Sequence, residues 1–269
     1  MNKRQIIKKT AFFMTGVLIL ASCEKVIDVD LNDSSPQIVI EGNITDQPGP
    51  YTVKLSKSVN FDELNDFPPI SGAMVQIRDD AGNSEILPET SPGIYTAASL
   101  QGTPGRTYTL EATIEEQTYT AVSTMPFPVA IDTLTVEEQS IGFGDKNSYV
   151  EARYKDPAGI DNYYHFVQLI NNVKQKGIII DKDWLQDGNT IRTSIEPDDE
   201  DDDVELKTGD QVTVFLQCVD EGVYEYYRSL NASDGDFSAS LTNPLSNFSG
   251  GVLGYFSAYA VTSKTIVIP

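Results

Sequence analysis

The chain has 269 residues and a formal net charge of −21 at pH 7, from 40 acidic and 19 basic side chains. We do not expect so acidic a chain to bind nucleic acid, whose phosphates require Lys and Arg, or to reach anionic lipid by charge. The length suggests one large domain or two ordinary ones, and a hydrophobic fraction of 40% is enough for packed cores.

The first residues carry a positive, an apolar and a small-residue part in succession. Four basic residues precede an apolar run at residues 11–20, which is shorter than the roughly 20 residues of a membrane-spanning helix. The tetrapeptide "LASC" at residues 20–23 then matches a bacterial lipobox, which predicts a lipoprotein signal peptide at residues 1–22 and acylation of Cys23. The alternative is a plain secretory signal peptide with a chance cysteine. Residues 23–36 are expected to be an acidic tether.

Residues 37–127 alternate between apolar and polar side chains in short runs. Examples are residues 37–43, 51–57 and 106–114, and turns rich in Gly and Pro separate these runs. Many short alternating segments with such punctuation predict an immunoglobulin-like β-sandwich, with "EEQ" at residues 115–117 as a hairpin loop.

Two prolines mark the end of this first half. Pro126 and Pro128 stiffen the chain and cannot donate hydrogen bonds to a sheet, so we place a domain boundary there. Residues 128–269 are predicted to form a second β-rich domain, with one helix near residues 220–233, where apolar residues recur at helical spacing. The expected fold class is therefore all-β, with two β-sandwich-like domains in tandem and one short helix in the second.

The residues that most often carry catalysis point to structural roles here. Cys218 shares the alternating face of Val214 and Leu216 and is expected to be a buried, inert thiol, unpaired once Cys23 is acylated. His165 has aromatic neighbours and is expected to be a structural strand residue. No metalloprotease, Ser-hydrolase, phosphate-loop or Cys/His metal motif occurs, so we expect no cofactor and no enzyme. A two-carboxylate hydrolase is a third, less favoured alternative.

Two acidic stretches could hold a cation. The run "EPDDEDDDVE" at residues 196–205 lacks the spacing of an EF-hand and is interpreted as a solvated loop, with a weak calcium site as the alternative. Asp181, Asp183 and Asp187 form a second oxygen-rich turn without a full metal-binding pattern. They are a weak alternative metal site only.

The most distinctive stretch is residues 242–261, where uncharged polar side chains, glycines and aromatic rings follow one another. Loops of this composition can approach a partner closely and offer aromatic anchors. The competing interpretation is a Gly-rich connection into the last core strand. The candidate partner or ligand loop consists of Asn243, Ser246, Asn247, Phe248, Ser249, Gly250, Gly251, Tyr255 and Phe256.

Four segments of the chain occur in one order that extends over nearly its whole length: "CEKVIDVDLND", "IVIEGNITDQPGPYTVKLSKS", "ISGAMVQIRDDAGN" and "NPLSNFSGGVLGYFSAYAV". Together they resemble a family of outer-membrane lipoproteins of the Bacteroidota that is classed as a domain of unknown function. The first domain separately resembles immunoglobulin-like and prealbumin-like modules. The resemblance implies an outer-membrane lipid anchor, on the periplasmic face or the cell surface, and a gene neighbourhood with a TonB-dependent receptor.

This resemblance shapes the expected function. We expect a non-catalytic accessory protein, or ligand-capture partner, of a TonB-dependent transporter, held to outer-membrane lipid through Cys23. The alternative is a structural or adhesive module of the cell surface. Asp132-Thr133-Leu134 also matches the pattern that Bacteroidota O-glycosylate in exported proteins, which makes Thr133 a candidate glycosylation site if it is exposed. In the predicted strand, however, Thr133 alternates with the apolar Ile131.

Overall fold

The computed structural model describes residues 35–59, 66–142, 145–197, 205–234 and 243–269. The predicted signal peptide, Cys23 and most of the tether lie outside the described residues, as does most of the acidic run at residues 196–205. From Pro36 onward the described residues belong to one compact unit. Among them, no helix combines the length and apolarity required to cross a lipid bilayer.

One antiparallel sheet of the first half runs in the order β4-β3-β7-β8. Its strands are β3 (Met74–Asp79), β4 (Ser84–Leu87), β7 (Thr107–Ile114) and β8 (Gln117–Thr124). Ile114 pairs with Gln117, and Glu115 between them has a φ of 56°. This confirms the predicted hairpin at residues 115–117, where a tight turn requires a positive φ.

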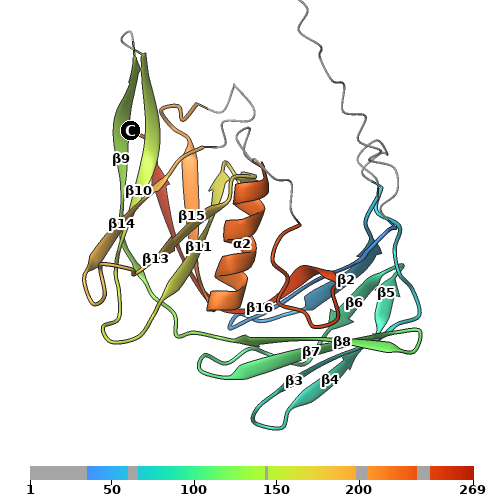
Figure 1. The fold of residues 1–269 in the computed structure, drawn as a ribbon. Helices are drawn as coiled ribbons and strands as arrows, with labels where there is room; N and C mark the ends of the chain where they lie inside the picture. Colours follow the sequence, from blue (N-terminus) through green and yellow to red (C-terminus); the bar gives the residue numbers. More distant parts are fainter. Residues whose placement is uncertain (1–34, 60–65, 143–144, 198–204, 235–242) are drawn as a thin grey trace, which may run out of the picture. The chain divides into compact units, whose positions relative to one another are not determined.

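A longer sheet faces this one and extends beyond it, in the order β12-β11-β15-β16-β1-β2-β6-β5, with β13 also paired to β11 (Figure 1). Apolar and polar residues alternate along these strands, so that one face of the sheet can be buried. In β2, for example, buried and exposed side chains alternate from Tyr51 to Leu55. The strands of the first half in this sheet are β1 (Ile38–Thr45), β2 (Tyr51–Lys57), β5 (Glu89–Ser91) and β6 (Ile94–Ala97). Those of the second half are β11 (Tyr163–Ile170), β12 (Val173–Lys174), β13 (Ile179–Lys182), β15 (Gln211–Val219) and β16 (Leu253–Val267).

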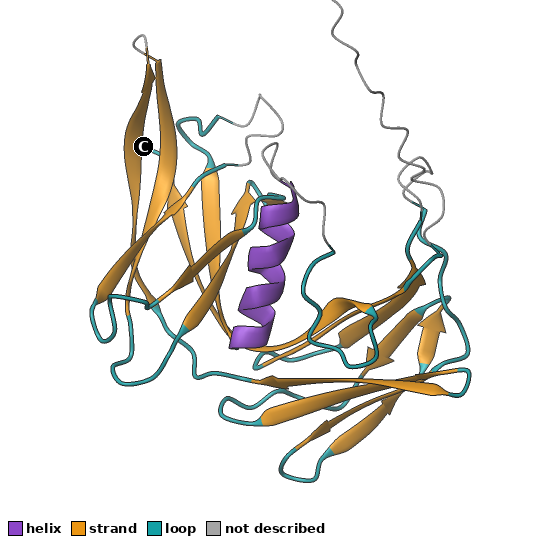
Figure 2. Cartoon of the chain, in the orientation of Figure 1, coloured by secondary structure: helices purple, strands orange, loops and turns teal. Residues whose placement is uncertain are grey.

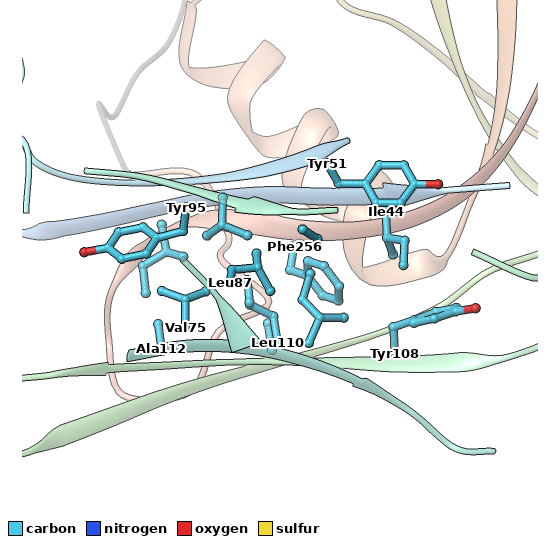
Figure 3. Close-up of a cluster of buried hydrophobic side chains, with 14 of the residues drawn as sticks. Ile44, Tyr51, Val75, Leu87, Tyr95, Tyr108, Leu110, Ala112 and Phe256 are labelled. Atoms are coloured by element: carbon cyan, nitrogen blue, oxygen red, sulfur yellow. The ribbon is translucent and has the colours of Figure 1, made fainter. Parts of the chain in front are cut away.

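The first hydrophobic core fills the space between these two sheets. Figure 3 shows Phe256, Leu110 and Leu87 between the layers, while the hydroxyls of the buried tyrosines lie toward the rim. The hydroxyls of Tyr51, Tyr95 and Tyr108 each have a backbone partner, which removes the cost of burying an unpaired polar group. Tyr51 donates to the carbonyl of Thr45 (2.8 Å), Tyr95 donates to that of Ile70 (3.1 Å), and Tyr108 accepts from the amide of Thr103 (2.7 Å).

The second core lies between the long sheet and a smaller antiparallel sheet. The smaller sheet has the order β14-β10-β9, with β9 (Ile131–Gly142), β10 (Asp145–Lys155) and β14 (Thr190–Ile195). Buried side chains of β9, β10, β11, β14 and β15 fill this core. Two cores enclosed by sheets confirm the expected all-β, sandwich-like fold class.

Strand β16 belongs to both cores. Its first half pairs in parallel with β1, from Val39↔Leu253 to Thr45↔Tyr259, and its second half pairs antiparallel with β15. The first core therefore includes side chains from the C-terminal end of the chain: Phe248, Val252, Phe256, Ala258 and Ala260. The boundary between residues 127 and 128 stays a prediction, because the last strand ties both halves together.

Helix α2 (Glu221–Asp234) covers part of the long sheet and is the helix drawn in Figure 2, the only one among the described residues. Asp220 caps it, since its Oδ1 accepts from the amide of Val223 (2.9 Å) while its Oδ2 accepts from the amide of Thr124 (2.9 Å). Val223 and Tyr224 are buried against the sheet. The helix predicted at residues 220–233 is confirmed.

Candidate functional site

The predicted partner loop at residues 243–256 is held to the fold by specific hydrogen bonds. Asn247 Nδ2 donates to the Phe256 carbonyl (2.7 Å), and Asn247 Oδ1 accepts from the Phe256 amide (3.0 Å). The Ser249 amide donates to the Thr120 carbonyl (2.8 Å). These contacts give Asn247 and Ser249 structural roles, whether or not the loop also meets a partner.

The aromatic residues of this loop divide between core and surface. Phe248 and Phe256 are buried in the first core, and Tyr255 is half-buried and accepts a hydrogen bond from the Tyr227 hydroxyl (3.0 Å). Gly250 and Gly251 are exposed, each with positive φ, and Asn243 and Ser246 are exposed and half-buried. The exposed remainder also includes Leu245, so the loop's role in binding a partner stays a prediction.

Only two of the three aspartates of the predicted oxygen-rich turn lie together, and a third aspartate from elsewhere in the chain joins them. Carboxylate oxygens of Asp183 and Asp187 lie within 4.8 Å of each other and of one from Asp156. Asp181 is not in this group, because its Oδ2 accepts from the hydroxyls of Thr193 (2.6 Å) and Tyr154 (3.3 Å). Three carboxylates this close could hold a hard cation such as calcium.

Local hydrogen bonds already organise this carboxylate group. Asp156 accepts from the Tyr164 hydroxyl (2.5 Å) and the Gly188 amide (2.9 Å), and Asp187 accepts from the Gly159 amide (2.7 Å). Burial, with the nearby charges of Asp156, Asp161 and Asp187, raises the pKa of Asp183. These hydrogen bonds therefore also give the three carboxylates a structural role, in which they link two loops.

Two further positions singled out in the sequence, Thr133 and Cys218, differ in their exposure to solvent. Thr133 is exposed although Ile131 is buried, because the β9–β10 register shifts between Arg153↔Thr133 and Tyr154↔Ile131. Cys218 is buried, and burial raises the pKa of its thiol to about 12. The thiol accepts a hydrogen bond from the Val129 amide (3.3 Å), which fits the expected inert, structural cysteine.

A hollow of about 210 Å³ lies beside helix α2 and was not anticipated from the sequence. Its walls come from separate parts of the chain: β11, the segment after β12, α2, and strands β1 and β16. The polar side chains along it are Glu41, His165, Lys174, Gln175, Lys176, Tyr226, Tyr227 and Tyr255. Aromatic walls with a few polar groups are typical of small-molecule sites.

His165 presents a neutral imidazole to this hollow. Its ring stacks on Tyr227, with centroids 4.0 Å apart and an interplanar angle of 16°, and its Nδ1 lies 2.8 Å from Gln217 Oε1. With Nδ1–H donating to that oxygen, Nε2 carries a lone pair. Burial lowers the pKa of His165 to about 4, so the ring is uncharged at neutral pH.

Tyr226 and Lys174 add a donor and a charge. Tyr226 is 8% exposed, its ring packs 4.5 Å from that of Tyr255, and burial raises its pKa, which keeps the phenol protonated. Its hydroxyl makes no hydrogen bond within the described residues. Lys174 is exposed and forms no ion pair there, whereas Glu41, the acidic side chain on the rim, lies 3.7 Å from Lys54 Nζ.

Sequence reasoning missed this site because its parts are far apart in the chain. The interpretation of "YYHFVQL" stopped at a structural histidine, and "VYEYYRSL" was used only to predict a helix. The available signal was the density of tyrosines near a histidine in a chain that has one His. Local spacing could not show that α2 would lie over β11.

Comparison with known proteins places the chain in one family. A family model described as a domain of unknown function matches residues 24–265. No curated protein matches the chain. Among solved structures, a two fibronectin type-III domain segment from chicken tenascin aligns with 10% identity over 87% of this chain and 99% of that chain, with a TM-score of 0.23.

Proposed function

The chain belongs to the family described as a domain of unknown function (DUF4249), and we propose that it is a lipid-anchored, non-catalytic protein that captures a small ligand for an outer-membrane transporter. The hollow beside α2 is the proposed capture site. Acylated Cys23 provides the anchor in outer-membrane lipid, and a TonB-dependent barrel is the proposed partner.

One observation carries this proposal: two buried side chains of the hollow have polar atoms without a protein partner. Neither His165 Nε2 nor the Tyr226 hydroxyl has a hydrogen-bond partner within the described part of the chain. Among the described residues, only Gln168 has fully buried polar side-chain atoms without a partner, so His165 Nε2 and the Tyr226 hydroxyl can be reached from the hollow. A ligand that enters the hollow can take the place of water at both atoms.

The placement of the reactive side chains supports a non-catalytic role. The imidazole of His165 contacts Gln217, whose amide cannot polarise it as a carboxylate would, and the Cys218 thiol is buried with a raised pKa. Both groups serve packing or orientation in the described structure. A binding protein requires no more.

The capture role is tested by closing the hollow. Gly177 lines it, and a Cβ built on Gly177 meets nothing within 4 Å, so the backbone leaves room for the larger side chain of Gly177→Phe to begin at the wall of the hollow. We expect mass spectrometry of the acylated full chain, purified from its host, to detect a small molecule that the variant loses. The control is Ile86→Phe, because Ile86 is 62% exposed on β4 and does not line the hollow. Identical small-molecule profiles for the wild type and Gly177→Phe would contradict the proposal.

The anchor and the transporter are tested in the outer membrane. Cys23→Ala should leave the chain unacylated and absent from the membrane fraction. Leu245 is 56% exposed in the predicted partner loop, so Leu245→Asp should reduce co-purification with the barrel while Ile86→Asp should not. Equal recovery of the barrel with both variants would remove the loop from the proposed interface.

A structural or adhesive module is the second candidate function. Its support is the pair of sheet-enclosed cores joined by β16, an arrangement suited to a spacer. The two functions differ in solution behaviour. A spacer would show no small molecule bound and would self-associate or bind a surface when several copies are displayed.

A further inference from the structure

We propose, building on the capture role above, that the hollow beside α2 binds a small organic anion with a flat ring and a hydrogen-bond donor. The class is defined by three complementary features of the walls: a lysine without an ion-pair partner, an imidazole acceptor and a set of aromatic rings. Each feature selects one property of the ligand.

The charge follows from Lys174. Lys174 lines the hollow and has no ion-pair partner among the described residues of a chain with 40 acidic and 19 basic side chains. Glu41 on the same rim is engaged by Lys54 at 3.7 Å, which reduces its repulsion of an incoming anion. A charge-assisted contact with Lys174 therefore favours a carboxylate over a neutral group.

The hydrogen-bond pattern follows from His165 and Tyr226. The Nδ1–H of His165 is used by Gln217, so the remaining Nε2 can only accept. The phenol of Tyr226 can donate. A ligand that fits both carries a hydroxyl or N–H group for His165 and an oxygen for Tyr226.

The flat ring follows from the size and walls of the hollow. A cavity of about 150 Å³ is enough for benzene, so a hollow of about 210 Å³ admits one six-membered ring with small substituents. The rings of His165 and Tyr227 lie 4.0 Å apart, and those of Tyr226 and Tyr255 lie 4.5 Å apart. Aromatic walls of this kind favour an aromatic or similarly flat ligand.

The single histidine gives a reporter inside the site. We would label the full chain with [13C]histidine and titrate it with 4-hydroxybenzoate, 4-hydroxybenzamide and 4-methoxybenzoate, following the His165 ring signals by NMR. The benzamide lacks the charge and the methoxy compound lacks the donor. We expect saturable shifts with 4-hydroxybenzoate and affinities at least about tenfold lower for the other two, since each loses one charged or buried hydrogen bond.

Matched lysine variants complete the test. Lys174→Gln should weaken 4-hydroxybenzoate binding at least about tenfold, whereas Lys57→Gln, an exposed lysine on β2 that does not line the hollow, should leave it unchanged. Equal affinity for the benzamide, or an equal effect of the two lysine variants, would overturn the assigned ligand class. If no probe binds while Gly177→Phe still loses a co-purified molecule, the capture role stands and the ligand class fails. If 4-hydroxybenzoate binds as expected but Gly177→Phe changes nothing in the host, the class stands and the capture role fails.

Discussion

The side-chain amide of Asn247 makes two hydrogen bonds to the backbone of Phe256, donating to its carbonyl at 2.7 Å and accepting from its amide at 3.0 Å. This pairing fixes the loop before β16 and holds the buried Phe256 ring in the first core. We expect Asn247→Ala to lower the free energy of unfolding by about 1–3 kcal/mol, because two backbone groups lose their partner. Urea denaturation measures the change.

The control for that change is Asn243→Ala. Asn243 is exposed, and its Nδ2 lies 3.3 Å from Gln37 Oε1, so its loss should alter stability by less than about 0.5 kcal/mol. Equal effects of the two substitutions would show that the Asn247 pairing contributes nothing specific.

Two glycines of the same segment should differ sharply in their tolerance of a methyl group. A Cβ on Gly254 would lie 2.1 Å from the Ile40 carbonyl oxygen, at a φ of +94°, whereas a Cβ on Gly251 meets nothing within 4 Å at a φ of +75°. We expect Gly251→Ala to cost about 1–2 kcal/mol from its backbone alone and Gly254→Ala to cost more than about 3 kcal/mol. Denaturant midpoints of the two variants test the ranking, and equal midpoints would mean that β1 and β16 can separate freely at this point.

Gln168 offers a substitution that should stabilise the protein. It is 2% exposed, and neither its Nε2 nor its Oε1 has a hydrogen-bond partner within the described part of the chain. Gln168→Met keeps the shape and removes the unpaired amide, so the free energy of unfolding should rise by about 1–3 kcal/mol. Gln217→Met is the contrast, since Gln217 bonds to His165 and its loss should destabilise. A loss of stability in Gln168→Met would show that the amide has a partner.

His165, the one histidine of the chain, predicts a pH dependence of stability. Burial lowers its pKa to about 4, below the value near 6.5 of an unfolded chain. The unfolded state therefore binds the proton first, and stability present above about pH 6.5 is lost as the pH falls toward 4. Between about pH 6.5 and 5 we expect a loss of up to about 1.4 kcal/mol per unit, measured by urea denaturation. His165→Gln should abolish this slope, and a slope retained in the variant would assign it to another group.

Thr133 should carry the predicted glycan, because the register shift at Asp132 turns its side chain outward. The intact mass of the chain from its native host should exceed the polypeptide mass, and Thr133→Ala should remove the excess. Thr135 is also exposed but follows Leu134 instead of an aspartate, so Thr135→Ala should retain it. An unmodified wild-type mass would disprove the prediction.

Local patterns predicted the local elements well. The alternation in residues 106–124 places β7, the turn at Glu115 and β8, because side-chain direction in a strand depends only on neighbouring residues. Helical spacing placed α2 for the same reason. The burial of Cys218 followed from its position on an alternating face.

The pairing of strands far apart in the chain could not be predicted from the sequence. Ile40 meets Gly254, and nothing in either segment encodes a parallel pairing across so much intervening chain. The hollow depends on that pairing, since it combines β1 and β16 with α2 and β11. The outward turn of Thr133 was equally hidden, because a one-residue irregularity reverses the face that strict alternation assigns.

The parallel pairing of β1 with β16 also determines how the protein would respond to tension. A pull on Gln37 along the strand, resisted by the core around the end of β16, would slide the two strands past each other along their length. The residue pairs from Val39↔Leu253 to Thr45↔Tyr259 would then bear the force together, and they would not separate one pair at a time. A parallel ladder loaded along its strands in this way would resist extension more strongly than a pair of strands that is peeled apart.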